Sequence, residues 1–347
     1  MNFYEKLTNP ENPFIIAEIG SNHNGDLSKA KQMIDVAVEA GCDAVKFQSW
    51  DYDSLFSQSI LDQHTDMVAE GVDAKGLEEI QKKLALSKEA HFELKQYADE
   101  KNILFFSYPL SEKHVDWLVE LDVPFIKVGS LDIVNLPLLK KIAKQGKPII
   151  LSTGMATLSE VEQALETIYN EGNRKVVLLH CVAVYPPQCE ENNLRNILML
   201  KETFGVPVGF SDHSTSIAIP AAAVALGASV IEKHIKLEGL PCRDAPVSLT
   251  PVELKRLVKD VREVAASMGS SKKQLLASEK DRRVSVFGRR SILTGRSLGA
   301  GEIINERDLV FKRPGTGISV NELERVVGRK LNKSKGPEEK ILWDDLE

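Results

Sequence analysis

Short runs of β-branched and aromatic residues alternate with amphipathic segments along most of this 347-residue chain, and this alternation restricts its fold more than any other feature. Strands that alternate with helices favour a parallel sheet. The runs are eight in number: FIIAEIG (14–20), DAVKFQ (43–48), ILFFS (103–107), PFIKV (124–128), PIILST (148–153), KVVLLHC (175–181), VPVGFS (206–211) and SVIEKHI (229–235). Eight such units of about thirty residues each predict an α/β fold, a (β/α)8 TIM barrel.

The segments between the runs have the spacing of helices. Met33, Val36, Ala37 and Ala40 recur at helical intervals, and Gly41 supplies a stop. Further helices are expected to begin near Leu86, Ser111, Leu136, Ser159, Asn193, Ser216 and Pro251. A doubly wound sheet is disfavoured, because such sheets usually have fewer strands and no G-x-G-x-x-G follows the first run.

The chain is expected to divide into a barrel and a smaller domain. The barrel takes residues 1–269, and the polar segment 270–284 has the composition of a linker. Residues 285–347 contain short strand-like runs punctuated by Gly and Pro, which predicts a small β-rich domain. The unit at 49–87 is longer than the others, and long excursions of this kind usually lie over the mouth of a barrel.

Charge and hydropathy restrict the possible partners. The net charge of −6 is modest and acidic, so neither nucleic acid nor an anionic membrane is an expected partner. The N-terminus lacks the pattern of a signal peptide and the longest apolar stretch is too short to span a bilayer, so a cytoplasmic protein is expected. The four cysteines form no C-x-x-C pair, which favours reduced thiols over disulfides or a thiolate zinc site.

The carboxyl ends of the predicted strands are rich in polar residues. Chemistry in a parallel barrel is concentrated at this end. The two-residue period of a strand puts Lys46 and Gln48 on one face, and likewise Glu232 and His234. The candidates are Glu18, Lys46, Gln48, Ser107, Lys127, Ser130, Ser152, Thr153, His180, Tyr185, Ser211, Asp212, His213, Glu232 and His234.

Two kinds of site could be built from these side chains. Lys46 and Lys127 inside a barrel are costly unless an anion compensates them, and with nearby serine hydroxyls they suit a phosphate or carboxylate ligand. His213 and His234 could ligate a divalent metal. Each signal alone has an ordinary explanation: a strand-end histidine is more often a hydrogen-bonded core residue, and a lysine is as often paired with a carboxylate. Asp212 could simply cap the next helix.

Several motifs resemble, in order and spacing, the sialic acid synthase family, which makes nine-carbon nonulosonic acids. They are IIAEIGSNHNGD, AVKFQ, STGMAT, GFSDHS and IEKHI. The tail RRSILTGRSLGAGEIINERDLVFKRPGTGIS is similar to the C-terminal antifreeze-like (SAF) domain of that family. The resemblance covers nearly the whole chain, and five motifs in the right order are far more specific than any one of them.

The resemblance implies a metal-dependent condensation of phosphoenolpyruvate with an N-acylated aldohexose derivative. The products are a 2-keto-3-deoxy nine-carbon acid, used for surface polysaccharides, and inorganic phosphate. Mn2+ or Mg2+ would polarise the sugar aldehyde while C3 of phosphoenolpyruvate attacks it, and water would then add at C2.

The resemblance also implies residue roles. Lys46 and Lys127 match positions that hold phosphoenolpyruvate, together with Ser130, Ser152 and Ser211, and we group Ser107 with these substrate-binding residues. His213 and His234 match the metal ligands. Residues that match positions touching the sugar or activating the water are Glu18, Gln48, Tyr185 and Asp244. Asp132 stands where family members usually carry Glu and is the candidate base that activates the water.

A domain-swapped homodimer is implied in the same way. In the family, an arginine of the KRPGTGIS motif closes the sugar pocket of the partner subunit, and here that residue is Arg313. The alternative is that Arg313 only anchors the small domain.

Two departures from the family pattern concern the sugar. The segment after LLHC reads Val182, Ala183, Val184, where sialic acid synthases tend to carry polar residues, and is more like relatives assigned to spore-coat or other surface polysaccharides. The segment LEGLPCRDAPVSLTP retains only Asp244 of the usual GPDH. A less polar wall favours a deoxygenated sugar, because a buried hydroxyl without a partner is penalised.

Two alternative functions stay open. A Schiff-base aldolase or lyase on the same barrel would use Lys46 or Lys127 as its nucleophile. A non-catalytic carbohydrate-binding protein would keep the barrel without turnover; the intact lysines and histidines weigh against it, whereas Asp132 and the apolar wall favour it.

Overall fold

The computed structural model describes residues 3–57, 59, 74–280 and 282–347. The chain divides into two compact units, Met1–Gly269 and Ser270–Glu347. Each unit has its own apolar core. Within the described residues, no helix is long and apolar enough to cross a membrane.

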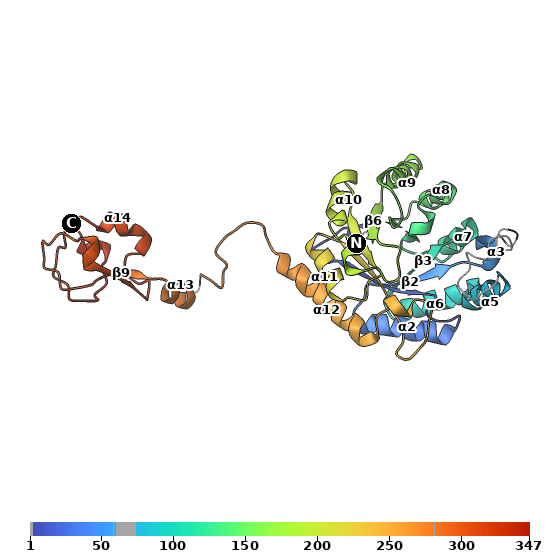
Figure 1. Cartoon of the computed structure of the whole chain (residues 1–347), viewed down its shortest axis with the longest axis horizontal. Helices are drawn as coiled ribbons and strands as arrows, with labels where there is room; N and C mark the ends of the chain where they lie inside the picture. Colours follow the sequence, from blue (N-terminus) through green and yellow to red (C-terminus); the bar gives the residue numbers. More distant parts are fainter. Residues whose placement is uncertain (1–2, 58, 60–73, 281) are drawn as a thin grey trace. The chain divides into compact units, whose positions relative to one another are not determined.

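The first unit is a barrel of eight parallel strands, as predicted (Figure 1). Its hydrogen-bonded order is β3-β2-β1-β8-β7-β6-β5-β4. The rings of Phe106 in β3 and Phe125 just before β4 lie 4.5 Å apart, so aromatic packing joins the two ends of this order. The strands are β1 (Phe14–Gly20), β2 (Ala44–Ser49), β3 (Leu104–Pro109), β4 (Ile126–Val128), β5 (Ile149–Ser152), β6 (Val176–Cys181), β7 (Val208–Asp212) and β8 (Val230–His234).

Helices surround the strands on the outside (Figure 1). They are α2 (Leu27–Ala40), α6 (Lys88–Glu100), α7 (Glu112–Glu120), α8 (Leu136–Ala143), α9 (Leu158–Asn170), α10 (Asn196–Phe204), α11 (Ala218–Ala225) and α12 (Pro251–Met268). The predicted starts agree to within three residues. The differences come from caps: Ser87 caps α6 from outside the helix, and Asn193 is left-handed with φ 42°, so α10 begins only at Asn196.

The long segment between β2 and α6 contains two helices, α3 (Tyr52–Leu55) and α5 (Ala74–Leu84). The backbone of Lys83 at the end of α5 lies against Gly25, where a Cβ would come within 1.9 Å of the Lys83 carbonyl oxygen. Residues 60–73 lie outside the described part of the chain, and with them the prediction that this excursion covers the barrel mouth.

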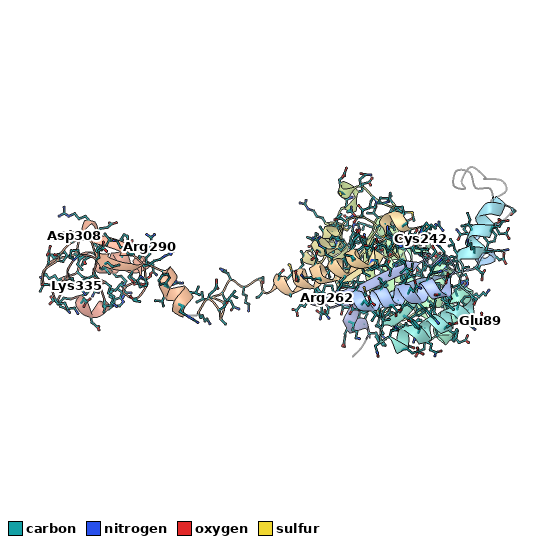
Figure 2. All side chains as sticks on the ribbon, turned by 90° about the horizontal axis from the view of Figure 1, so that it is seen from below. Glu89, Cys242, Arg262, Arg290, Asp308 and Lys335 are labelled. Carbon is teal, nitrogen blue, oxygen red and sulfur yellow. The ribbon has the colours of Figure 1, made fainter. Side chains whose placement is uncertain are left out.

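The second unit is small and β-rich, as predicted. It contains a two-stranded antiparallel sheet of β9 (Ser291–Thr294) and β10 (Leu309–Lys312), with helices α13 (Arg282–Gly288) and α14 (Leu323–Val326). Residues 270–280 form neither helix nor strand, and α13 starts inside the segment that the composition assigns to the linker. Figure 2 labels Asp308 and Lys335, two ion-pair residues of this unit.

Candidate active site

A cluster of four charged side chains occupies the barrel interior. The Nζ atom of Lys46 lies 3.0 Å from Oε2 of Glu18 and 3.3 Å from Oε2 of Glu232. Lys127 Nζ lies 4.0 Å from Oε1 of Glu232. All four side chains are buried, and the register pairs Glu18 of β1 with Lys46 of β2. Strands β1, β2, β4 and β8 therefore bring two cations and two anions together, with no net charge when all four are ionised.

Burial and mutual attraction set the protonation of this cluster. Burial raises the pKa of Glu18 to about 7 against the opposing effect of Lys46. Burial lowers the pKa of Lys127 to about 8. Burial alone would raise the pKa of Glu232, but Lys127 and Lys46 outweigh it and the pKa is lowered. Near neutral pH, Glu232 therefore stays ionised, while Glu18 and Lys127 are the groups whose pKa values lie closest to the solution pH.

Two serine hydroxyls contact Lys127 and Glu232, and a third, that of Ser130, follows the strand that carries Lys127. Lys127 donates to Oγ of Ser152 at 2.6 Å, and the Ser211 hydroxyl donates to Oε1 of Glu232 at 2.9 Å. Oγ of Ser130 accepts from the backbone N–H of Gly154 at 3.0 Å, and a Cβ at Gly154 would come within 2.8 Å of that oxygen. Hydroxyl and ammonium donors therefore converge on one region, an arrangement suited to a phosphate or carboxylate.

The two histidines lie side by side beyond this cluster. The ring centroids of His213 and His234 are 5.4 Å apart, and Tyr185 stacks on His213 at 4.0 Å. Burial lowers the pKa of both histidines, so both rings are neutral, as metal ligation requires. His213 Nδ1 is 2.8 Å from the carbonyl oxygen of Val182, which assigns the proton to Nδ1 and leaves the lone pair on Nε2.

These histidines fit a divalent metal with open coordination positions. The Nδ1 atom of His234 is buried and has no hydrogen-bond partner in the described part of the chain, although Oδ2 of Asp244 lies 3.5 Å away. No cluster of three or more His, Cys, Asp or Glu with metal-site geometry occurs among the described residues. A metal held by the two histidines would keep positions for substrate oxygens.

Asp212 does not belong to this site. It stands between Ser211 and His213 at the end of β7 and faces away from the barrel interior, where Lys233 Nζ contacts its Oδ2 at 2.7 Å. Its Oδ1 accepts from the backbone N–H of Ser214 at 2.8 Å. The GFSDHS and IEKHI motifs thus contribute His213, Glu232 and His234 to one site. Asp212 and Lys233, from the same motifs, form a buried ion pair behind it.

Gln48, Asp132 and Asp244 also border the interior. The Gln48 amide donates to Oε1 of Glu18 at 2.9 Å. Asp132 follows β4 in a short 3-10 turn that begins at Ser130, so it shares a loop with one of the hydroxyl donors. The structure thus brings these residues to the same end of the barrel as the histidines.

Besides Asp212, two other candidate residues face away from this cluster. Ser107 faces the helix layer, where its hydroxyl forms a 2.7 Å hydrogen bond with Ser49, which in turn contacts Nε2 of His91 at 2.8 Å. His180 likewise faces outward, with its Nε2 2.7 Å from the carbonyl oxygen of Asn192. Arg313 belongs to the second unit.

Tyr108 is the residue that the sequence reasoning missed. It lies opposite Gln48 in the β2–β3 register and so faces inward, and its hydroxyl donates to Oδ2 of Asp132. The strand period puts Phe106 and Tyr108 on one face and Ser107 on the other. The register between β2 and β3 would have shown that Tyr108 faces inward beside Gln48, but that register could not be read from the local sequence.

Comparison with known proteins identifies the relatives of both units. A profile of the NeuB family matches residues 33–273, and one of the SAF domain matches residues 289–347. The chain is 41% identical over 330 residues to the N,N'-diacetyllegionaminic acid synthase of Campylobacter jejuni, covering 94% of this chain and 98% of that protein. It is 42% identical over 269 residues to human N-acetylneuraminate-9-phosphate synthase, covering 77% of this chain and 74% of that one.

A solved structure agrees with this assignment. The crystal structure of an N-acetylneuraminic acid (sialic acid) synthetase from Leptospira borgpetersenii in complex with citrate superposes with a TM-score of 0.69 at 37% identity. The alignment covers 78% of this chain and 90% of that chain.

Proposed function

This chain belongs to the NeuB family of nonulosonic acid synthases, and we propose that it condenses phosphoenolpyruvate with an N-acylated, deoxygenated aldose in a divalent-metal-dependent reaction. The products would be a nine-carbon 2-keto-3-deoxy acid and phosphate. The observation that carries the proposal is the convergence of Lys46, Lys127 and three serine hydroxyls beside the paired histidines.

Phosphoenolpyruvate binds at the lysine cluster in this proposal. Lys127 and Ser152 already form a hydrogen-bonded pair, and Ser130 and Ser211 add hydroxyl donors around it. Fixed donors orient a charged ligand without covalent bonding and hold its C3 toward the second substrate. Glu232 keeps the two ammonium groups buried and charged when the anion is absent.

The sugar aldehyde lies beside His213 and His234. A divalent ion, Mn2+ or Mg2+, held by these two histidines would supply Lewis-acid polarisation of the aldehyde oxygen. Tyr185 packs against His213, while Gln48, Glu18 and Asp244 line the adjacent surface with hydrogen-bonding groups. Asp132 would accept the proton of the water that adds to C2.

The pH dependence of phosphoenolpyruvate binding is a first prediction. Lys127 is charged below its pKa of about 8 and neutral above it, so attraction for the anion is lost as the pH rises through 8. Glu18, with a pKa of about 7, gains a negative charge over a lower pH range, and this charge also repels the anion. We expect the Kd from calorimetry without sugar to rise from pH 7 and more steeply above pH 8, reaching about tenfold per pH unit for each group.

A Lys127→Arg variant separates these two contributions. Arginine stays charged throughout this range, so only the shallower rise that comes from Glu18 should remain. A wild-type Kd that stays constant from pH 7 to 9.5 would remove Lys127 from the phosphate site.

The residues after β6 support a sugar with fewer hydroxyl groups. Val182, whose carbonyl oxygen lies 2.8 Å from His213 Nδ1, leads through Ala183 and Val184 into Tyr185, which stacks on the same ring. An apolar wall disfavours a substrate hydroxyl that would lose its water partners there. The similarity to a synthase named for an N,N'-diacetyl product supports a diacetamido sugar.

Phosphate release from phosphoenolpyruvate tests the reaction and the sugar together. Metal-stripped protein is assayed with and without Mn2+ across a panel of N-acylated hexoses. We expect release that depends on the metal, with kcat/KM for a 6-deoxy diacetamido hexose at least about 10-fold above that for N-acetylmannosamine, given the modest discrimination of apolar pockets. A higher kcat/KM for N-acetylmannosamine would contradict the sugar assignment but not the condensation.

The lowered pKa of Lys127 favours one competing mechanism, a Schiff-base aldolase. Borohydride reduction in the presence of substrate distinguishes the two. The proposed condensation leaves no reduced lysine adduct detectable by mass spectrometry, whereas an aldolase traps one on Lys46 or Lys127.

We also propose a domain-swapped homodimer in which Arg313 completes the sugar pocket of the partner subunit. The support is the KRPGTGIS motif within the matched SAF domain. The mass of one chain is 38.4 kDa, and light scattering of the intact protein should give twice this value. A monomer that retains full activity would refute the arrangement.

A further inference from the structure

Tyr108 occupies the barrel interior in a position that the surrounding residues define closely. Its partner across the strand pair is Gln48, whose side chain contacts Glu18. Tyr108 is 6% exposed, and its ring lies over Gly129, where a Cβ would come within 2.5 Å of a ring carbon. Any side chain at position 129 would therefore displace the ring, and the glycine allows the phenol to reach the loop after β4.

The hydroxyl of Tyr108 and the carboxylate of Asp132 form one hydrogen-bonded unit. Tyr108 donates to Oδ2, and Nδ2 of Asn135 donates to Oδ1 at 2.9 Å. Asn135 is itself held as the N-cap of α8. Burial, and then the neighbouring Asp132, raise the pKa of Tyr108, so the phenol keeps its proton and remains a donor. Asp132 is therefore anchored by α8 on one side and meets Tyr108 from the barrel interior on the other.

We propose that Tyr108 and Asp132 act together as the catalytic base, with the phenolic oxygen of Tyr108 contacting the attacking water and Asp132 taking up the proton. The inference rests on the proposed condensation. In this step the water oxygen bonds to the cationic C2, one water proton passes to the Tyr108 oxygen, and the phenol proton passes to Oδ2 of Asp132. The phenol is regenerated, the carboxylate becomes neutral, and the proton is released after phosphate has left.

The reach of the side chains supports this assignment. Asp132 has the shorter of the two acidic side chains, and its carboxylate is turned to Asn135 and Tyr108. Asp132 also lies two residues after Ser130, on the loop that carries this proposed phosphate-binding hydroxyl. A phenol between this short carboxylate and the substrate extends its reach, and proton relays through tyrosine are within the range of general base catalysis.

Substitutions at the two positions test whether they act as a unit. We expect Tyr108→Phe and Asp132→Ala each to lower kcat about 100-fold. We expect the double variant to lose no more than either single one, whereas independent residues would lose about 10,000-fold. The Kd for phosphoenolpyruvate in Tyr108→Phe should stay within about twofold of wild type, a result that a collapsed site would not give.

The chain offers a matched control in Tyr97, whose hydroxyl donates to Asp35 at 2.9 Å between helices α6 and α2. Tyr97→Phe removes the same kind of hydrogen bond away from the barrel interior and should leave kcat within about twofold of wild type. The second test is Tyr108→Phe combined with Asp132→Glu. The longer carboxylate should recover about 10-fold of the lost kcat if Tyr108 supplies reach, but not if Tyr108 only orients Asp132.

The outcomes separate this inference from the proposed function. Phosphate release by wild type together with an unchanged kcat in Tyr108→Phe overturns the Tyr108–Asp132 unit alone. Losses that multiply in the double variant, or no recovery with Asp132→Glu, also overturn it. Absence of phosphate release by the wild-type protein with every sugar overturns the condensation, and the unit with it.

Discussion

Replacing Lys46 by methionine should both destabilise the barrel and abolish turnover. Lys46 is the only side chain within 3.5 Å of both Glu18 and Glu232 among the ion pairs of the described residues. Its removal leaves two buried carboxyl groups facing each other, and breaking a buried ion pair in this way costs about 3–5 kcal/mol. We expect the free energy of unfolding in urea to fall by about this amount at pH 8, and phosphate release to fall by at least about 1,000-fold.

The loss of stability in this variant should depend on pH with a definite sign. Glu18 already has a raised pKa of about 7 in the folded protein, so a proton relieves the repulsion from Glu232 more easily at low pH. A group with a raised folded pKa stabilises the fold below its unfolded pKa and loses that contribution as pH rises through the folded pKa. The destabilisation should therefore be smaller at pH 6 than at pH 8, and the reverse order would refute our description of the cluster.

Lys233→Met is the matched control for this prediction. Lys233 is also a buried lysine paired with a carboxylate, Asp212, at 2.7 Å, but the pair lies behind the strands. Both variants should lose stability by similar amounts. Only Lys46→Met should lose binding of phosphoenolpyruvate measured by calorimetry on the folded fraction, and equal loss of binding in both would show that the effect is structural.

Removal of the divalent metal should have the second large effect. Chelation of the wild-type protein should lower phosphate release by at least about 1,000-fold, since Lewis-acid activation contributes several kcal/mol to such reactions. Added Mn2+ should restore it. His213→Ala and His234→Ala should not recover with Mn2+, and electron paramagnetic resonance should detect weaker Mn2+ binding by both variants.

His180→Gln provides the control for the metal prediction. His180 lies on the neighbouring strand β6 but faces outward, with its Nε2 toward the Asn192 carbonyl oxygen, and a glutamine amide can still donate there. This variant should keep its Mn2+ affinity and its response to chelation. Unchanged turnover of chelated wild-type protein would rule out the metal-dependent mechanism and leave the histidines as structural residues.

The predicted barrel agrees with the structure because the signals that carry it are local. The eight apolar runs and the helical spacing between them depend on neighbours a few residues apart, and so do the caps at Ser87 and Thr157. Lys46 and Gln48 share one face of their strand, as do Glu232 and His234, because of the two-residue period of a strand. These features could be read directly from the chain.

The composition of the candidate site was predictable only in part. The pattern of polar residues at the strand ends identified Lys46, Lys127, His213 and His234, and the structure brings all four to one end of the barrel. Ser107 was expected among them, but the register of β3 turns it toward Ser49 and brings Tyr108 inward instead. A shift of one residue in register exchanges the two faces of a strand, and nothing in the local pattern decides it.

The sequence alone therefore determined the order of the elements, the fold class and most of the polar residues at the strand ends, because periodicity and motif spacing are properties of short segments. The tertiary structure decided which of two adjacent polar residues faces the barrel interior: Tyr108 over Ser107, and Ser211 and His213 over Asp212. It also decided that Lys46 bridges Glu18 and Glu232, from strands far apart in the chain. The physical reason is that these contacts depend on the register and closure of parallel strands, which arise only when the whole barrel has assembled.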